Sequence, residues 1–353
     1  MTVTCTTPSI QSGDFTALLS QKQFDIFSFT DVTHLGTEEK IAVAKALDIV
    51  LLEFLRSINY QHPQRLPDRE LRDQLWAWAD ANVKSIPGCK LSVIETILEV
   101  SASLTEWYYP LAELDTRLHV AKLTTAVLSG DDGQTGNSGR SLNYFLYDIL
   151  RGQKVQGQWQ NMFADVVKDM VEHYGAMDPR IGAFAASDVV LWVEAQPTEN
   201  HFAATLPPHY SLIPAGKKTN GCCPDGFASI FREWTGASSG WIAPIFKPSR
   251  DTEVPYEYWI TSLANLKVFL NLGNDLFSVP KEILQNDAYN YMGLATISKR
   301  QANTPSRFTC ADATHSVQGW TFRDTLCETM ESIRDATLAL DRAFVQFERY
   351  LLT

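Results

Sequence analysis

Three oxygen-bearing side chains recur every fourth residue in segment 274–282, which reads Asn-Asp-Leu-Phe-Ser-Val-Pro-Lys-Glu. In an α-helix, Asn274, Ser278 and Glu282 would lie one above another on a single face. They offer an amide carbonyl, a hydroxyl and a carboxylate, which together carry only one formal charge. Such a set suits a Mg²⁺ ion that completes its coordination with water and substrate phosphate. The spacing is compatible with a Mg²⁺ site, but taken alone it is better explained by three polar residues that happen to align on an exposed helix.

A proline interrupts this segment just before its last candidate ligand. Pro280 cannot donate a hydrogen bond to the carbonyl of Leu276. We expect the helix to kink or break there. A break would move Glu282 off the line of the other two side chains and make it the weakest ligand; alternatively, the kink is accommodated at the rim of a cavity. Asn274 and Ser278 precede the proline and are the firmer pair of predicted ligands.

Two adjacent aspartates, Asp131 and Asp132, end another apolar helical pattern, which steps through Val120, Leu123 and Val127. Carboxylates at the end of a helix are hard oxygen ligands that can bridge Mg²⁺ ions. A glycine on either side of the pair is typical of a solvated turn. Taken alone, the aspartate pair is better explained by such a turn.

A single arginine, Arg232, lies in an apolar and aromatic helical segment between these two patterns. Its planar guanidinium has the geometry to bind a phosphate group, although a surface ion pair with Glu233 would explain it equally well. Glycines and serines follow at 236–240 and weaken a helix. We therefore expect a helix break there, with backbone carbonyls open toward a cavity.

Long helices must position these residues, because apolar side chains recur at three- and four-residue spacing along most of the chain. The sequence contains neither a series of short alternating strands nor an internal repeat. We predict a poorly ordered segment over 1–35 and one all-α domain over 36–353. Its irregular stretches are expected at 129–139, 195–222 and 301–317. The predicted helices are 38–58, 68–84, two within 91–128 separated near Tyr109-Pro110, 140–152, 157–173, 180–194, 224–238, 255–283 and 319–351.

The bulk composition argues against several kinds of partner. The 353 residues carry a formal net charge of −11 without a run of lysine and arginine, which disfavours nucleic acids and anionic membranes. No stretch reaches transmembrane length, and the N-terminus has no apolar leader core, so we expect no stable membrane insertion. The six cysteines form no CxxC pair, as in a cytoplasmic protein with reduced thiols.

The pattern Asn-Asp-x-x-Ser-x-x-Lys-Glu at 274–282, together with the aspartate pair and Arg232, resembles the motifs of class I terpene cyclases. Arg232 lies 42 residues before Asn274, as the diphosphate-sensing arginine does in that family. The resemblance covers about residues 90–351 and is strongest to the fungal trichodiene synthase-like branch of sesquiterpene cyclases. It implies a single-domain class I terpene synthase fold, in which helices surround a central apolar active-site cavity.

The same resemblance implies roles for individual residues. Three Mg²⁺ ions would be held by Asp131, Asn274, Ser278 and Glu282, and Asp132 would support a cationic residue outside the metal shell. Arg232 and Lys281 would contact the diphosphate. Thr235 and Gly236 match the linker and the effector at the family's helix break.

The chain departs from the family pattern in two places. Thr135 stands where the pattern has a third acid, and for that reason only Asp131 of the pair is taken as a metal ligand. The family's C-terminal Arg-Tyr motif is expected slightly beyond Arg349 and Tyr350. Either this pair contacts the diphosphate instead, or the motif lies beyond Thr353.

The activity implied by the resemblance is that of a terpene synthase, a carbon–oxygen lyase acting on a diphosphate. Mg²⁺-dependent ionisation of farnesyl diphosphate would release diphosphate and give an allylic cation. The cation would then cyclise to a sesquiterpene hydrocarbon or to an alcohol such as longiborneol. Aromatic faces can stabilise a cation. The candidate aromatic residues, for each of which core packing is an alternative, are Trp107, Tyr108, Trp192, Phe202, Trp234 and Phe269.

Two other functions stay open at this point. A chain-elongating prenyl diphosphate synthase has the same fold and metals, but usually carries a second full aspartate-rich motif, which this sequence lacks. A catalytically inactive helical binding protein would keep the fold and lose the chemistry. A homodimer is an open alternative to a monomer.

Overall fold

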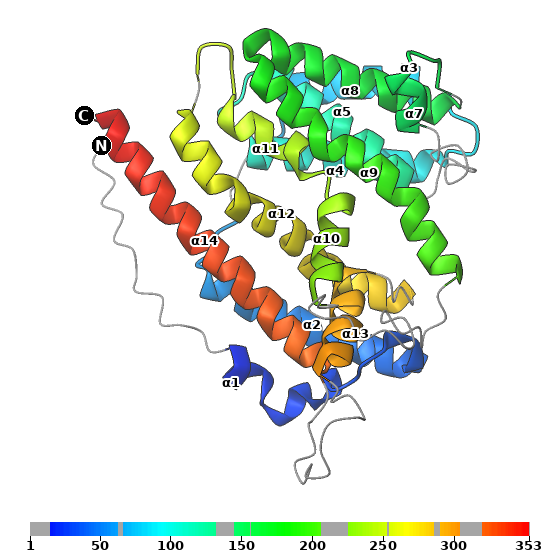
Figure 1. Cartoon of the computed structure of the whole chain (residues 1–353), viewed down its shortest axis with the longest axis vertical. Helices are drawn as coiled ribbons and strands as arrows, with labels where there is room; N and C mark the ends of the chain where they lie inside the picture. The colour runs from blue at the N-terminus through cyan, green and yellow to red at the C-terminus, as the bar shows by residue number, and fades with distance from the viewer. Residues whose placement is uncertain are drawn as a thin grey trace. The chain divides into compact units, whose positions relative to one another are not determined.

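The computed structural model describes residues 15–62, 66–131, 145–155, 157–205, 225–252, 254–285, 290–303 and 320–352. Every regular element in these ranges is helical, which confirms the predicted all-α class (Figure 1). None of the helices within the described ranges is long and apolar enough to cross a membrane.

The helices group into two compact units. The first comprises Met1–His62, Thr205–Arg232 and Val268–Thr353, and the second comprises Pro63–Ala204 and Glu233–Lys267. Three helices contribute residues to both units: α9 (Pro179–Thr205), α10 (Asp225–Thr235) and α12 (Tyr256–Gln285). The prediction of one domain over 36–353 stays a prediction, as does the central apolar cavity.

The first unit is built around an apolar core between its N-terminal segment and three long helices. Buried side chains from α2, α12 and α14 meet there, among them Phe54, Leu276 and Met330. The elements that lie wholly within this unit are α1 (Phe15–Leu19), the 3₁₀ helices η1 (Lys22–Phe27) and η2 (Val32–His34), α2 (Thr37–Ser57), α13 (Tyr291–Asn303) and α14 (Phe322–Leu352).

Residues 15–35, predicted to be poorly ordered, are part of this core, so the prediction is wrong for them. Phe15, Phe24 and Phe27 are almost fully buried. Nη2 of Arg323, on α14, donates to the carbonyl of Phe24 and to the side chain of Asp25, both at 3.0 Å. The segment was missed because its helical pieces are too short for a 3.6-residue pattern to be recognised.

Helix α12 continues through Pro280 to Gln285, so the expected interruption does not occur. One lost backbone hydrogen bond is offset by packing, because Leu276, Val279 and Ile283 on both sides of the proline are buried. Three other expectations also need correction. Helix α9 (Pro179–Thr205) extends into the predicted loop at 195–222, and α13 was not predicted. The helix predicted over 224–238 ends earlier, because α10 ends at Thr235 and a second helix, α11 (Ser238–Phe246), begins at Ser238.

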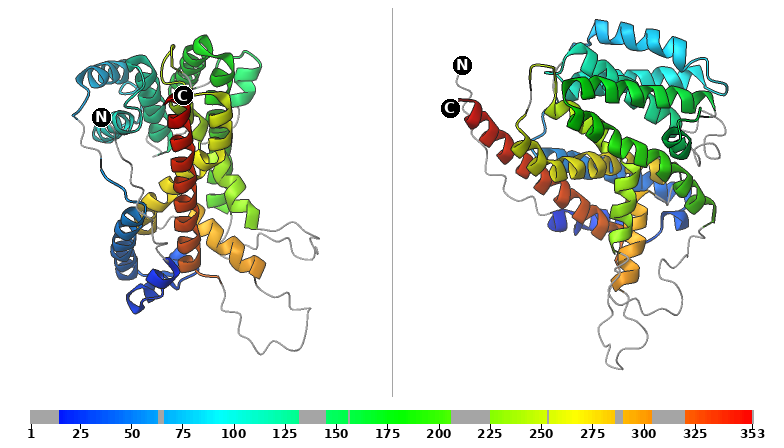
Figure 2. Two further views of the ribbon diagram at one scale, coloured as in Figure 1. Left: turned by 90° about the vertical axis from the view of Figure 1, so that its left-hand side faces the viewer. Right: turned by 45° about the horizontal axis from the view of Figure 1, so that its top comes forward.

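In the second unit, α3, α4, α8 and α11 all pack against α5 (Leu114–Asp131; these helices run from cyan to yellow-green in Figure 2). The break between α4 and α5 falls near Tyr109, as predicted. The remaining helices of this unit are α3 (Arg69–Asn82), α4 (Leu91–Tyr108), α7 (Phe145–Leu150) and α8 (Gln158–Met177).

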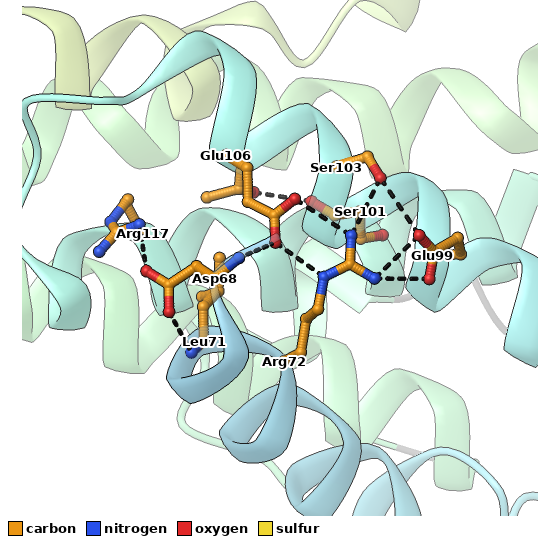
Figure 3. A network of polar contacts seen from close by, with 9 residues as sticks. Asp68, Leu71, Arg72, Glu99, Ser101, Ser103, Glu106 and Arg117 are labelled. Atoms are coloured by element: carbon orange, nitrogen blue, oxygen red, sulfur yellow. Dashed lines mark hydrogen bonds and ion pairs between the residues drawn. The ribbon is translucent and has the colours of Figure 1, made fainter. Parts of the chain in front are cut away.

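A network of ion pairs joins α3, α4 and α5 in this unit (Figure 3). Arg72 donates from Nε to Glu106 at 2.8 Å and from Nη1 to Glu99 at 2.7 Å. Glu106 is buried and also accepts from the backbone N–H of Asp68 at 2.8 Å. Arg117 on α5 binds the Asp68 carboxylate at 2.7 Å. The Glu106 carboxylate is stable in the interior because it is both paired and hydrogen-bonded.

Helices α8 and α9 approach each other closely where two glycines meet. A Cβ atom at Gly182 would lie 2.8 Å from the Cα and N atoms of Gly175 and 3.0 Å from the carbonyl of Val171. These are backbone atoms, so the contact could be relieved only by separating the helices. At Gly175 itself, a Cβ atom would meet no atom within 4 Å.

We predict that Gly182→Ala lowers the free energy of unfolding by roughly 1–3 kcal/mol, the usual cost of overpacking. Gly175→Ala is the matched control, and should be neutral or stabilising by up to about 1 kcal/mol because alanine favours helix. Urea unfolding followed by circular dichroism measures both changes. Equal effects of the two substitutions would contradict the close crossing.

Candidate functional site

The predicted row of oxygens lies on one face of α12. Asn274 is exposed, and Ser278 and Glu282 are partly buried. The Ser278 hydroxyl donates to Oε1 of Glu282 at 2.6 Å. Glu282 therefore stays in line with Ser278 across the proline, and the expectation that Pro280 would displace it is wrong.

Arg232, near the end of α10, is bound to this part of α12. Its Nε donates to Oδ2 of Asp275 at 2.8 Å, and its Nη2 donates to Oδ1 of Asn274 at 3.0 Å. The same Nη2 lies 3.2 Å from the carbonyl of Asn271. The anionic partner expected for an arginine in an apolar helix is thus the acid beside Asn274.

Asp275 was not among the predicted site residues. Its side chain is 8% exposed and that of Arg232 is 15% exposed. Burial raises the pKa of Asp275 to about 6, although the charge and the hydrogen bond of Arg232 act to lower it. The carboxylate is still ionised at neutral pH. The sequence did carry a signal for Asp275: it is an acid next to Asn274 in an apolar helix. A buried acid needs a cationic partner, just as a buried arginine needs an anionic one.

The side chains on α12 fit a Mg²⁺ ion by their chemistry. All three predicted ligands offer hard oxygen atoms, which Mg²⁺ prefers. The two oxygens of Ser278 and Glu282, 2.6 Å apart, are already near the spacing of about 2.9 Å between adjacent ligands in an octahedron with 2.0–2.1 Å bonds. The amide oxygen of Asn274 is engaged by Arg232.

A helix break follows α10, where it was predicted. Helix α10 ends at Thr235, and Ala237 adopts a left-handed conformation with φ of 48° before α11 begins at Ser238. Thr235 and Gly236 thus lie at the end of α10 and in the break. Their roles as linker and effector stay predictions.

Buried polar contacts in the second unit tie α11, immediately after the break, to α9 and α12. Ser238 donates to the Asp188 carboxylate at 3.0 Å, and Lys267 pairs with the same oxygen at 2.8 Å. The Ser239 hydroxyl accepts from the Asp188 N–H at 2.9 Å and donates to the carbonyl of Ala185 at 3.1 Å. Asp188 and Lys267 were missed because the contact joins residues 79 positions apart, which no local pattern reveals.

Several predicted site residues have side chains outside the described part of the chain. Asp131 is the last residue of α5, as expected, and Arg349 and Tyr350 lie in α14. Asp132 lies beyond the described ranges. Lys281 is exposed on α12. The roles of these residues stay predictions; those whose side chains are not described are Asp131, Asp132, Phe202, Arg349 and Tyr350.

The predicted cavity aromatics have different surroundings. Trp192 is buried and lies 5.5 Å, ring centre to ring centre, from Phe163 and 6.2 Å from Trp159, a contact typical of core packing. Phe269 packs at the edge of the first unit's core. Trp107, Tyr108 and Trp234 are each exposed by 40% or more.

Comparison with known proteins gives one distant similarity. No protein-family model matches the chain. Over 266 residues, or 75% of each protein, the chain is 20% identical to terpene synthase BipA of Cochliobolus sativus. The same protein from strain ND90Pr / ATCC 201652 of that species matches equally. The chain is therefore similar to a fungal terpene synthase over three quarters of its length.

We predict that Asp188→Ala lowers the free energy of unfolding by roughly 2–4 kcal/mol, because it leaves Lys267 and Ser238 without their acceptor in a largely buried place. Glu172→Ala is the control, since it removes an exposed partner of Lys168 in the same unit and should cost under about 0.5 kcal/mol. Chemical denaturation measures both. If the two variants unfold alike, the Asp188 contacts do not hold the helices together.

Proposed function

We propose that this protein is a class I terpene cyclase that converts farnesyl diphosphate into a cyclic sesquiterpene. The observation that supports it most is that Arg232 hydrogen-bonds to α12 beside the predicted metal ligands. Its Nη2 lies 3.0 Å from Oδ1 of Asn274, and its Nε lies 2.8 Å from Oδ2 of Asp275. A cationic fork beside hard oxygen ligands is the arrangement that binding of a metal-bound diphosphate requires. The similarity to terpene synthase BipA supports the same class of reaction.

In this proposal Asn274, Ser278 and Glu282 hold Mg²⁺. When bound, Mg²⁺ supplies positive charge that stabilises the departing diphosphate. Arg232 binds diphosphate oxygens through its guanidinium, and Lys281, exposed on the same helix, adds a second positive charge. These fixed charges favour the charge distribution that develops as the carbon–oxygen bond breaks.

The allylic cation then reacts with double bonds of its own chain. An apolar surface must fold that chain so that the reacting carbons lie close together, and must keep water away until the final step. The helix break at Gly236 is the proposed place where backbone carbonyls face the cation. The released product is a hydrocarbon if proton loss ends the reaction, and an alcohol if water adds to the final cation.

We predict that the purified chain with farnesyl diphosphate and Mg²⁺ releases a cyclic sesquiterpene, detected by gas chromatography–mass spectrometry, and that EDTA abolishes it. Asn274→Ala should lower kcat/KM on the order of a hundredfold, because a metal ligand is worth several kcal/mol of charge stabilisation. Asn265→Ala is the control, since Asn265 lies nine residues earlier and thus on the opposite face of α12.

Three results would contradict this function. Full product formation in EDTA would exclude the metal-dependent mechanism. Product formation only after addition of isopentenyl diphosphate, with a longer prenyl diphosphate as the product, would make the protein a chain-elongating synthase. Binding of diphosphate and Mg²⁺ without turnover of farnesyl or geranyl diphosphate would make it an inactive binding protein.

A further inference from the structure

One oxygen atom on α12 has two possible binding partners. Oδ1 of Asn274 accepts a hydrogen bond from Nη2 of Arg232, and the proposed function assigns this atom to Mg²⁺. A divalent cation bound there would lie next to the positively charged guanidinium of Arg232, whose side chain is mostly buried, and like charges at such a distance repel one another. The contact with Arg232 and the contact with the cation therefore exclude one another.

The two side-chain contacts of Arg232 differ in strength. Nε donates to a carboxylate that is 8% exposed, whereas Nη2 donates to a neutral amide on an exposed residue. Both bonds have the charged guanidinium as donor, but only the bond to Asp275 also has a charged acceptor, and breaking a buried ion pair leaves an uncompensated charge. When a cation approaches, the bond to Asn274 is the one that gives way.

We propose that Asp275 is a positioning residue, which holds Arg232 by Nε while the guanidinium exchanges the amide of Asn274 for an oxygen of the diphosphate. This inference rests on the proposed function and deepens it. In the free protein, Arg232 blocks a metal ligand. Once Mg²⁺ takes the Asn274 oxygen, the released N–H group of Arg232 is directed to the incoming phosphate by the bond to Asp275.

The consequence is that Mg²⁺ and diphosphate each favour the binding of the other through the protein, beyond their attraction in solution. Mg²⁺ alone must displace Arg232, which weakens its binding. Diphosphate removes that penalty because it gives Arg232 a new acceptor. The size of this coupling is set by one charge-assisted hydrogen bond.

The first experiment removes the pair without changing the net charge. The double variant Arg232→Met with Asp275→Leu replaces a mostly buried ion pair by apolar side chains of similar size, which is often tolerated or stabilising. Isothermal titration with Mg²⁺ alone should show binding about tenfold tighter than in the wild type, since Asn274 is no longer engaged. Inorganic diphosphate, titrated at constant free Mg²⁺, should bind about tenfold more weakly.

The matched control removes an ion pair elsewhere in the first unit. Lys299 on α13 pairs with Glu328 on α14, and the double variant Lys299→Met with Glu328→Leu leaves the net charge unchanged as well. Its Mg²⁺ and diphosphate affinities should equal those of the wild type. Mg²⁺ affinity that is equal in the wild type and in the Arg232/Asp275 variant would overturn the exchange.

A single substitution tests the role of Asp275 even if the double variant does not fold. Asp275→Asn keeps the size of the side chain but removes the charge that holds Nε. Diphosphate affinity should fall about tenfold in the folded protein, with Arg232 still present. A lower melting temperature with unchanged diphosphate affinity would mean that Asp275 is only structural, and would overturn the proposal.

Failure of the inference can be told apart from failure of the function. If the wild type forms a sesquiterpene but its Mg²⁺ affinity does not respond to loss of the pair, only the exchange is wrong. If the wild type neither binds Mg²⁺ nor turns over farnesyl diphosphate, the proposed function is wrong and the exchange with it.

Discussion

An arginine withdrawn from water must keep an acid beside it, and in this protein that requirement joins α10 to α12. The Arg232–Asp275 pair is mostly buried, so neither side chain can be moved away without leaving a charge in a poorly solvated place. The pair fixes the rotation of α12 relative to α10, and with it the direction in which Asn274 points. The proposed chemistry depends on that orientation, since the predicted ligands share a single face of one helix.

Regular helix geometry positions the other predicted ligands of the site. In α12, a repeat of four residues brings Ser278 close enough to bond Glu282, although Pro280 lies between them. Burial of the apolar residues around the proline keeps the helix intact. The break after α10 is stable for a different reason: the serines that follow it have buried partners on α9, where Ser239 hydrogen-bonds with both an N–H and a carbonyl of that helix.

Most of the long helices and the oxygen row could be predicted from the sequence, because both depend on spacing within a single helix. Contacts between distant segments could not be predicted. Asp275 was a visible acid, but only the folded structure shows that Arg232, 43 residues earlier, is its partner. The Asp188–Lys267 pair was missed for the same reason. The effect of Pro280 was overestimated, since a local rule takes no account of the packing on either side of the proline.

The N-terminal segment that begins at Phe15 covers part of the first unit's apolar core. Phe29 stacks on Phe322 with ring centres 4.7 Å apart, and its carbonyl accepts from the N–H of Phe322 at the start of α14. A recombinant version that began near residue 36, where the first long helix starts, would lack these contacts. It would expose apolar side chains, including Phe54 on α2 and Phe322 on α14, to solvent, and such surfaces promote aggregation. Expression, tagging and crystallisation should therefore keep the segment that begins at Phe15 attached to the helices that it covers.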